Sequence, residues 1–523
     1  MTDRSPDNVL FVVLDTVRKD RLGPYGYDRG TTPSLSAFAE EATVFDAAVA
    51  PAPWTLPVHA SMFTGLYPSQ HGADQESPYL EGAQTLAKTL SQAGYDTAAY
   101  SSNAWITPYT NLTEGFDDGD TFFEVMPGEY LSGPLSKVWK AMNDNDRLRD
   151  FASSAVQFGA KIHEYLASGD GADTKTPSVI DKTISFIDES ESETGWFAFI
   201  NLMDAHLPYY PPEEYRREFA ADADPDAVCQ NSKEYNSGAR DIDDDEWDDI
   251  GDLYDAEIAH MDDQLGRLFE WLKETDQWDD TTVVVCADHG ELHGEHDLYG
   301  HEFALYEQLI NVPLMIKHPA LDDDRTAAVV ELLDLYHTVL DATDVRRDGS
   351  TTGVQSGENR VVGFDPTRSL FDSRYRQFDS ADGNRDPGQR ANEEAAGEYA
   401  FVEYAQPVIE LHHLEEKAKA AGLEIEDDHR ARARLRAARS SDGKFIRADR
   451  IPDEGFVLGE DPAESRPVSP NDHDAVEAAE RALSRFESAT GGAWTEATDA
   501  RADALEDADE KLQERLSDLG YME

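Results

Sequence analysis

The sequence predicts an α/β fold with a largely parallel central sheet flanked by helices, together with a small C-terminal antiparallel unit and a helical tail. Apolar runs recur along the first two thirds of the chain, without the alternation of a sheet that faces water on one side. Segments with helical spacing separate these runs, and strands that alternate with helices form parallel sheets. Polar residues with ligand chemistry follow several runs directly, as they do at the carboxyl ends of strands in open α/β sheets.

Five apolar runs are the expected strands of the central sheet. They are Asn8–Leu14, Gly94–Tyr100, Trp196–Leu202, Thr282–Ala287 and Val312–Ile316. Helices are expected at Gln84–Ala93 and Tyr254–Lys273. The second of these helices carries its apolar residues at helical spacing, which indicates one buried face.

Composition divides the chain into three parts. Residues 1–342 form an α/β domain, interrupted at about 104–190 by a mixed, helical insertion placed to roof a site. Residues 343–470 are a loop-rich segment and a small subdomain, and residues 471–523 are an acidic amphipathic helical tail. Three short strands are expected in the second part, at 399–404, 436–439 and 443–447. The acidic stretch 221–252 is expected to be a surface loop.

The charge of the chain limits its partners. Its 523 residues include 45 Lys and Arg against 107 Asp and Glu, a formal net charge of −62. Because the acidic residues are spread over every region, the surface repels nucleic acid and anionic membranes. Such a surface suits high salt, where the screening length falls to about 3 Å at 1 M, and a halophilic host follows as a hypothesis.

The compartment is expected to be cytoplasmic. The chain has only two cysteines, Cys229 and Cys286, which argues against a disulfide framework. The first residues are polar, and the apolar run from Val9 to Leu14 is too short for a signal peptide or a membrane span.

Acidic residues and histidines follow three of the expected strands. Asp15 closes the first strand, Asp204 and His206 follow the third, and Asp288 and His289 follow the fourth. Because carboxyl ends of parallel strands meet at one edge of a sheet, we expect these regions to converge on one crevice. An adjacent Asp and His offer one oxygen and one nitrogen donor to a divalent cation.

The segment from Ala52 to Gly65 carries a family resemblance. It resembles the signature of the sulfatase family, a branch of the alkaline phosphatase superfamily, which begins with Cys or Ser, continues x-Pro-x-Arg and ends Thr-Gly. Pro57 and the final Thr-Gly pair match this pattern. Thr55 stands at the nucleophile position and His59 at the Arg position, at what we expect to be a strand-to-helix turn.

A second segment, residues 287–301, resembles the second signature of the same family and its phosphoester-cleaving relatives. The resemblance makes Asp288 and His289 metal ligands, and Asp15 matches the first of two consecutive Asp ligands. Thr16 stands at the second of these positions and offers a weak hydroxyl ligand or none. One divalent metal ion is therefore implied, and a mixed Asp/His set suits Mn²⁺ or Zn²⁺ at least as well as Ca²⁺.

Four residues take catalytic roles through the resemblance. His301 stands in the place of the family's Lys near the leaving group, and His206 matches its His-x-Pro element near the transferred group. Thr55 would attack phosphorus or sulfur in line, and His59 would orient Thr55 or bind the metal-facing oxygen. Either His301 or His206 would stabilise or protonate the leaving oxygen.

The resemblance implies metal-dependent hydrolysis of a phosphate or sulfate ester through Thr55, with a phosphoester favoured. Sulfatases oxidise their Cys or Ser to an aldehyde, whereas the secondary Cβ of Thr55 gives only a ketone. The family's Lys-x-His element, which grips sulfate, is replaced here by the segment Ser101–Trp105.

Two other functions stay open. In a roofed, water-poor site the group on Thr55 would pass to an acceptor hydroxyl, as in a phosphotransferase or sulfotransferase. A catalytically silent metal- or glycan-binding protein would keep the site without turnover. The expected partner is a small-molecule or glycan-linked phosphate or sulfate ester, with no nucleic acid and no membrane, and the oligomeric state is unknown.

Overall fold

A nine-stranded sheet forms the centre of the computed structural model, which describes residues 8–74, 77–108, 110–120, 175–322, 324–345, 363–372, 375, 398–405 and 407–490. The strand order is β11-β2-β10-β6-β1-β5-β3-β4, with β9 beside β2. The strands are β1 (Asn8–Leu14), β2 (Thr43–Val49), β3 (Asp96–Ser101), β4 (Asp118–Asp120), β5 (Trp196–Leu202), β6 (Thr281–Cys286), β9 (Asn311–Val312), β10 (Leu314–Lys317) and β11 (Arg325–Glu331).

The central strands run in parallel, which confirms the predicted fold class. β1 pairs in parallel with β5 on one side and β6 on the other, so Val13 lies between Asn201 and Cys286. β10 is antiparallel to both β6 and β2. The carboxyl ends of β1, β5 and β6 therefore meet at one edge of the sheet.

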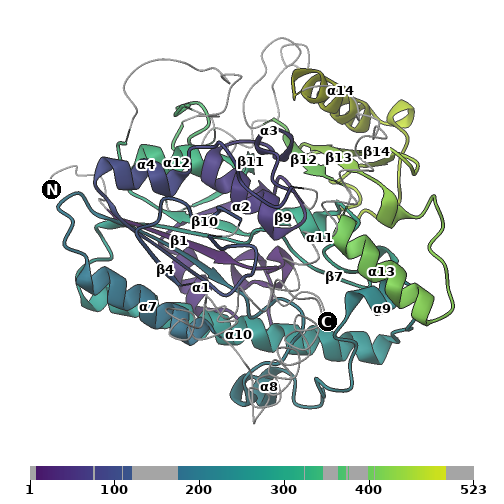
Figure 1. Ribbon diagram of the computed structural model, residues 1–523, viewed down its shortest axis with the longest axis horizontal. Coiled ribbons are helices and arrows are strands. Elements are labelled where there is room, and N and C mark those ends of the chain that lie inside the picture. Colours follow the sequence, from purple (N-terminus) through teal and green to yellow (C-terminus); the bar gives the residue numbers. More distant parts are fainter. Residues whose placement is uncertain are drawn as a thin grey trace, which may run out of the picture.

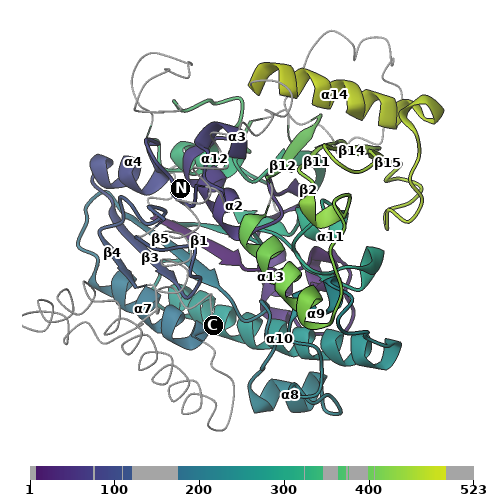
Figure 2. The ribbon, with the colours of Figure 1, turned by 45° about the vertical axis from the view of Figure 1, so that its right-hand side comes forward.

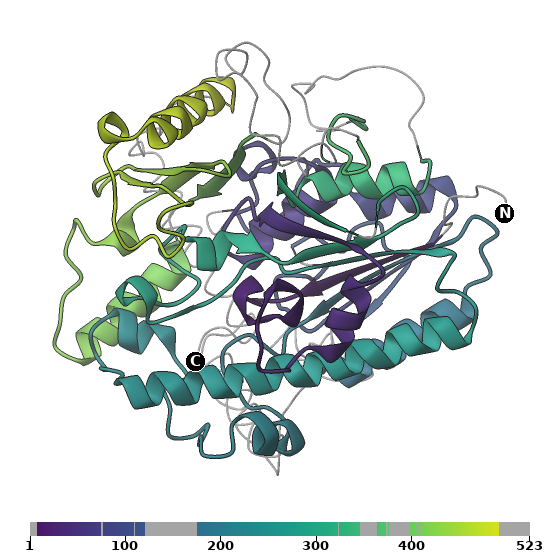
Figure 3. The ribbon, with the colours of Figure 1, turned by 180° about the vertical axis from the view of Figure 1, so that it is seen from behind.

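Helices cover both faces of the sheet (Figures 1 and 3). α2 (Thr55–Thr64), α4 (Leu86–Ala93) and α12 (Asp334–Ala342) lie on one face, and α1 (Pro33–Ala39), α7 (Thr176–Glu189) and α10 (Asp244–Glu274) lie on the other. β5 and β6 are buried along their whole length. Burial on both faces explains why the central strands read as continuous apolar runs.

The acidic stretch 221–252 is not the surface loop that its composition predicts. The short helix α9 (Ser232–Asn236) lies within it, and α10 begins inside it and continues to Glu274. The Asp243 side chain accepts a hydrogen bond from the backbone N–H of Glu246 at 3.0 Å, and acidic residues fill the first turn of α10. Carboxylates at these positions cap a helix and complement its dipole, so the acidic composition stabilises this helix start.

Pro313 divides the strand that the sequence predicts at 312–316. Because proline has no N–H to donate, β9 ends before it and β10 begins after it. Three strands of the sheet, β2, β4 and β11, have no counterpart in the sequence prediction. β2 and β11 contain alanines and charged residues instead of a continuous apolar run, and β4 has only three residues, inside the stretch expected to be helical.

A four-stranded antiparallel sheet forms the predicted C-terminal unit (Figure 2). Its strands are β12 (Ala400–Tyr404), β13 (Leu435–Arg439), β14 (Lys444–Ala448) and β15 (Glu454–Phe456), with α13 (Val408–Ala420) between the first two and α14 (Asp474–Thr490) packed on the sheet. The backbone N–H of Glu403 in β12 donates to the Pro51 carbonyl at 2.9 Å. The C-terminal sheet is thus tied to the segment that leads into α2.

Several predictions concern residues outside the described part of the chain. These residues are 121–174 of the insertion, most of 343–398 and the end of the tail after 490. The described ends of the insertion hold β4 and α7, and the described start of the tail is α14. No helix in the described ranges is long and apolar enough to cross a bilayer.

Candidate active site

Three buried ligand-type residues converge where β1 and β6 end. Asp15 follows β1 directly, and Asp288 and His289 follow β6 by a short turn. Because β1 and β6 are parallel neighbours, the residues after them lie side by side. One ligand atom from each of the three residues lies within 4.8 Å of the other two.

Each of the two carboxylates has one paired oxygen and one oxygen without a partner. Oδ2 of Asp15 accepts from the side-chain amides of Asn103 at 2.7 Å and Asn201 at 2.9 Å. Oδ1 of Asp288 accepts from two backbone N–H groups, at 2.9 and 3.3 Å. The remaining oxygens, Oδ1 of Asp15 and Oδ2 of Asp288, are buried without a hydrogen-bond partner among the described residues.

The electrostatics of this cluster fit a divalent cation. Burial and the neighbouring Asp288 raise the pKa of Asp15 well above its ordinary value. Burial also opposes the charge of Asp288, but His289 and His59 hold the pKa of that carboxyl below its ordinary value. Burial lowers the pKa of His289, which disfavours its charged form. Two crowded carboxylates with unpaired oxygens beside an imidazole are the donor set that a metal ion satisfies.

Thr55 places a hydroxyl beside this cluster. It is the first residue of α2 and is almost completely buried, and the extended residue Trp54 precedes it. Its Oγ1 lies 3.4 Å from Nε2 of His289 and 3.3 Å from Nδ2 of Asn103. The start of a helix favours a nearby anion, and the Thr55 hydroxyl lies at the start of α2.

His59 lies one helical turn below Thr55. Its Nδ1 lies 2.9 Å from the Thr55 carbonyl and 3.7 Å from Oδ2 of Asp288. The ring is fully buried against Phe63 and Phe199, and its Nε2 has no hydrogen-bond partner among the described residues. His59 thus contacts the backbone of Thr55 and a candidate ligand instead of the Thr55 hydroxyl.

His301 and His206 extend the cluster away from Thr55. The His301 ring centroid lies 4.4 Å from that of His289 and 5.4 Å from that of His206. Nδ1 of His301 lies 3.1 Å from Oε1 of Glu291, whose burial raises its pKa to about 8. The structure therefore brings together all seven residues that the resemblance selects.

Two residues at the strand ends have other contacts. Thr16 adopts a left-handed backbone conformation with φ 57°, and its hydroxyl lies 2.6 Å from the Ala205 carbonyl. Asp204 accepts a hydrogen bond from Nδ1 of His260 at 2.8 Å and is not part of the three-residue cluster. The region after β5 thus joins the site through His206, while Asp204 bonds to His260.

Three polar residues of the site were not selected from the sequence. They are Asn103, Asn201 and Glu291. Asn201 interrupts the apolar run of β5, which was a usable signal because a polar residue in a buried strand needs a partner. Asn103 and Glu291 carry no such signal, since a polar residue in a turn is ordinary.

The turn that carries Asp288 and His289 requires a glycine. The N–H of Gly290 donates to the Leu309 carbonyl at 2.8 Å. A Cβ at Gly290 would lie 1.9 Å from the backbone oxygen of Gln308. The close approach of these two backbone segments holds the turn in place.

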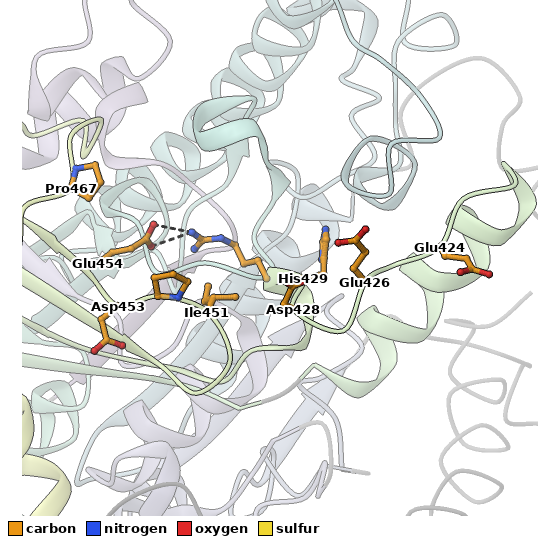
Figure 4. Close-up of a pocket in the computed structure, with 10 residues that line it drawn as sticks. Glu424, Glu426, Asp428, His429, Ile451, Asp453, Glu454 and Pro467 are labelled. Carbon is orange, nitrogen blue, oxygen red and sulfur yellow. Dashed lines mark hydrogen bonds and ion pairs between the residues drawn. The ribbon is translucent and has the colours of Figure 1, made fainter.

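A pocket of about 720 Å³ lies apart from these residues, in the C-terminal unit (Figure 4). Its lining residues are Glu424, Glu426, Asp428, His429, Arg430, Ile451, Pro452, Asp453, Glu454 and Pro467. Arg430 donates to both carboxylate oxygens of Glu454, at 3.0 and 3.1 Å. Half of the lining side chains are carboxylates, so this pocket repels an anionic ester.

Comparison with known proteins identifies the family to which this α/β fold with its strand-end cluster belongs. The sulfatase family profile matches residues 7–345. An arylsulfatase of Clostridium perfringens is 23% identical over 380 residues, covering 66% of this chain and 77% of that protein. The multifunctional alkaline phosphatase superfamily protein PehA of Trinickia caryophylli is 27% identical over 390 residues, covering 64% and 73%. A phosphonate monoester hydrolase of Agrobacterium radiobacter superposes with a TM-score of 0.62 at 20% identity, covering 93% of this chain and 95% of that chain.

The chain belongs to the sulfatase family, because the family profile covers well over half of it. It is accordingly a hydrolase that acts on ester bonds. The family is metal-dependent, and Asp15, Asp288 and His289 are the candidate metal site in this chain.

Proposed function

We propose that this protein hydrolyses a singly charged phosphoester, a phosphodiester or a phosphonate monoester, with Thr55 as the nucleophile. The observation that carries the proposal is the position of the Thr55 hydroxyl, 3.4 Å from Nε2 of His289 at the start of α2. A metal ion held by Asp15, Asp288 and His289, Mn²⁺, Zn²⁺ or Ca²⁺, would lower the pKa of a nearby hydroxyl and offset negative charge on the ester oxygens.

The chemistry of threonine favours phosphorus over sulfur. A sulfatase uses the hydrate of an aldehyde, and Thr55 cannot supply one because its Cβ carries a methyl group. A plain hydroxyl acts by attacking the ester and forming a covalent intermediate, which water then releases. Asn103 supports this role, since its amide contacts both Oγ1 of Thr55 and Oδ2 of Asp15 and so fixes the hydroxyl beside the cluster.

The charge of the site favours a substrate with one negative charge. Within the described part of the chain, the hydrogen-bond partners of Thr55 and the three candidate ligands include no lysine or arginine. Two cations near Glu291, the buried Arg18 and the partly buried Lys233, are paired with other residues. Arg18 pairs with Asp20 and Glu295, and Lys233 pairs with two glutamates. The charges of two carboxylates and one divalent ion sum to zero. The site therefore gives a doubly charged phosphate monoester less electrostatic stabilisation than it gives a singly charged diester.

One relative and one solved structure are consistent with this direction, although other similar proteins are named sulfatases. The alkaline phosphatase superfamily protein PehA is 27% identical to this chain, whereas the arylsulfatase is 23% identical. The superposed hydrolase acts on phosphonate monoesters, as its name states. These likenesses add weight to the phosphoester, and the residues of the site carry the proposal.

A substrate comparison tests this function. We expect bis(4-nitrophenyl) phosphate or 4-nitrophenyl phenylphosphonate to be cleaved at least about 10-fold faster, in kcat/KM, than 4-nitrophenyl sulfate or phosphate. Each substrate is assayed in molar KCl with Mn²⁺, Zn²⁺ and Ca²⁺ in turn. Fastest cleavage of the sulfate would contradict the phosphoester assignment.

Substitution of Thr55 tests the nucleophile. Thr55→Ala removes covalent catalysis and should lower kcat by about 10³-fold or more, roughly 4 kcal/mol, with metal binding and folding nearly unchanged. Thr55→Ser keeps the hydroxyl and should retain part of the activity. Near-normal turnover by Thr55→Ala would mean that water or another residue attacks.

A further inference from the structure

Phe303 is a strained residue two positions after His301. Its backbone has φ 71°, in the left-handed region that a bulky side chain rarely adopts. The segment 287–303 uses glycine for positive φ at two other positions, where Gly294 has φ 94° and Gly300 has φ 89°. A strained residue persists only where its surroundings hold it, and such residues cluster at active sites. Position 303 therefore keeps an aromatic side chain where a glycine would relieve the strain.

The C-terminal unit holds both the side chain and the backbone of Phe303. The ring is 1% exposed and packs in an apolar cluster with Leu411 and Leu414 of α13 and with Ala431. The backbone N–H of Phe303 donates to the hydroxyl of Tyr404, at the end of β12, at 3.1 Å. Every one of these partners lies beyond position 400, so Phe303 is anchored outside the central sheet.

The residue before Phe303 is tied to the same helix. The carboxylate of Glu302 forms an ion pair with Lys233 of α9. Lys233 in turn pairs with Glu410 of α13 at 2.6 Å. α13 and α9 lie side by side in both views (Figures 1 and 2). The two residues that follow His301 are thus both held, directly or through Lys233, by α13.

His301 faces the candidate metal site from this anchored segment. Its ring centroid lies 4.4 Å from that of His289 and 5.4 Å from that of His206. His301 is separated from Phe303 by a single residue of backbone. A displacement of Phe303 would therefore move the His301 ring relative to the three candidate ligands.

We propose that Phe303 is a positioning residue through which the C-terminal unit holds the His301 ring beside the candidate metal site. The proposal rests on the proposed function, in which His301 is one of the two histidines expected to act on the leaving oxygen. The contacts of Phe303 are made with the C-terminal unit, so its effect on turnover passes through His301.

Substitution of Phe303 tests this role. Phe303→Ala and Phe303→Gly remove the ring and should each lower kcat by about 10- to 100-fold, because a misplacement of about 1 Å at a reacting centre has an effect of this size. Phe303→Leu keeps an apolar anchor and should retain most of the activity. Each assay uses the whole chain in molar KCl with a saturating metal ion, on whichever ester the parent protein cleaves, and below the melting temperature of every variant.

The glycine and alanine variants separate positioning from stability. Because glycine adopts φ 71° without strain, Phe303→Gly should melt at a higher temperature than Phe303→Ala and yet be no faster. A purely structural role predicts that kcat follows the melting temperature. Phe38→Ala is the matched control, since the buried Phe38 ring of α1 packs against Phe269 and Trp278. It should lower the melting temperature and leave kcat unchanged.

A double variant tests whether Phe303 acts through His301. Phe303→Ala combined with His301→Gln should be no slower than His301→Gln alone, because both changes remove one function. Calorimetric titration with Mn²⁺, Zn²⁺ and Ca²⁺ should give Phe303→Ala the same metal Kd as the parent protein. An unchanged Kd shows that the loss of kcat does not come from a lost ion.

The outcomes distinguish this inference from the proposed function. Losses that multiply in the double variant, a kcat of Phe303→Ala equal to that of the parent, or a loss explained by weaker metal binding would each overturn the role of Phe303. His301→Gln with the parent's kcat would overturn it as well. A parent protein that cleaves the sulfate fastest would contradict the phosphoester assignment, while the Phe303 variants assayed on that sulfate would still test this inference.

Discussion

Asn103 joins the two parts of the site that the sequence presents separately. Its amide contacts the Asp15 carboxylate at 2.7 Å and the Thr55 hydroxyl at 3.3 Å. These contacts connect the segment after β3, the end of β1 and the start of α2. In the sequence, Asn103 lies only where the family's Lys-x-His element is absent. Its contacts require the segments of Asn103, Asp15 and Thr55 to come together in the fold, which no local sequence pattern predicts.

The seven selected residues all match positions of the family's motifs. Asn103 and Asn201 match no such position, and Glu291 lies inside the second signature but was not selected. Asp288 and His289 lie in a signature, so a single sequence is enough to select them. Asn201 contacts Asp15, which lies 186 positions away in the chain. Glu291 contacts His301, which lies 10 positions away. Their roles therefore become visible only with the geometry.

Metal removal is a prediction at the scale of single residues. A chelator should lower the melting temperature, and restoring the ion should raise it, because an ion at about 100 times its Kd stabilises the folded state by about 2.7 kcal/mol. Asp15→Asn and Asp288→Asn should abolish the metal-dependent increase. The measurement is thermal unfolding with and without Mn²⁺, Zn²⁺ and Ca²⁺.

The control for this experiment is Asp204→Asn. Asp204 also follows a strand of the central sheet, but it bonds to His260 and lies outside the cluster. The variant should keep the full metal-dependent increase, whatever its own stability. An increase that survives in Asp15→Asn would place the ion elsewhere.

At the scale of elements, the site depends on how α2 is held at its two ends. Its first residue is Thr55, and its C-cap, Gly65, has φ 68°. A Cβ at Gly65 would lie 2.9 Å from Tyr336 Cδ1 and 3.0 Å from His337 Nε2, both on α12. α12 thus packs closely against the end of the helix that presents the nucleophile.

His337 gives this contact a pH dependence. Burial and the nearby Arg368 lower the pKa of His337 to about 3. In the unfolded chain the pKa is about 6.5, so between these values the unfolded state binds the proton and the folded state does not. The stability that neutral His337 contributes is therefore fully present above about pH 6.5. It is lost by about 1.4 kcal/mol per pH unit as the pH falls below that value.

The variant His337→Asn should weaken this acid sensitivity. Its side-chain oxygen can replace Nδ1, which accepts from the backbone N–H of Asp365 at 3.2 Å. Between about pH 7 and pH 5, the parent protein should lose about 1–2 kcal/mol more unfolding free energy than the variant. Denaturant titrations in constant salt measure this difference. The same change at the half-exposed His412 is the control for the substitution itself.

The elements themselves were predictable where one physical cause dominates. Strands buried on both faces, such as β1 and β5, read as apolar runs, and the fold class followed from them. β2 and β11 are held by pairing with each other and by neighbouring elements, so their own sequences are less distinctive. The start of α10 was missed because acidity was interpreted as solvation, although Asp243 caps the helix.

At the scale of the whole molecule, the excess of acidic over basic residues is the dominant feature. Buried ion pairs such as Lys444–Glu464 join the C-terminal unit internally, yet 107 acidic residues face only 45 lysines and arginines. Most carboxylates therefore have no cation to pair with, and they repel one another in the compact state.

Stability should accordingly rise with salt. Between about 0.1 M and 1 M KCl the Debye length falls from about 10 Å to about 3 Å, so the repulsion between surface carboxylates is largely screened. The melting temperature should increase steeply over this range, and most of the gain should come early, where the screening length changes most. Thermal unfolding in a KCl series measures this, with sucrose at matched osmolality as the control for excluded-solute effects. A flat profile, or an equal gain in sucrose, would remove charge repulsion as the cause and with it the hypothesis of a halophilic host.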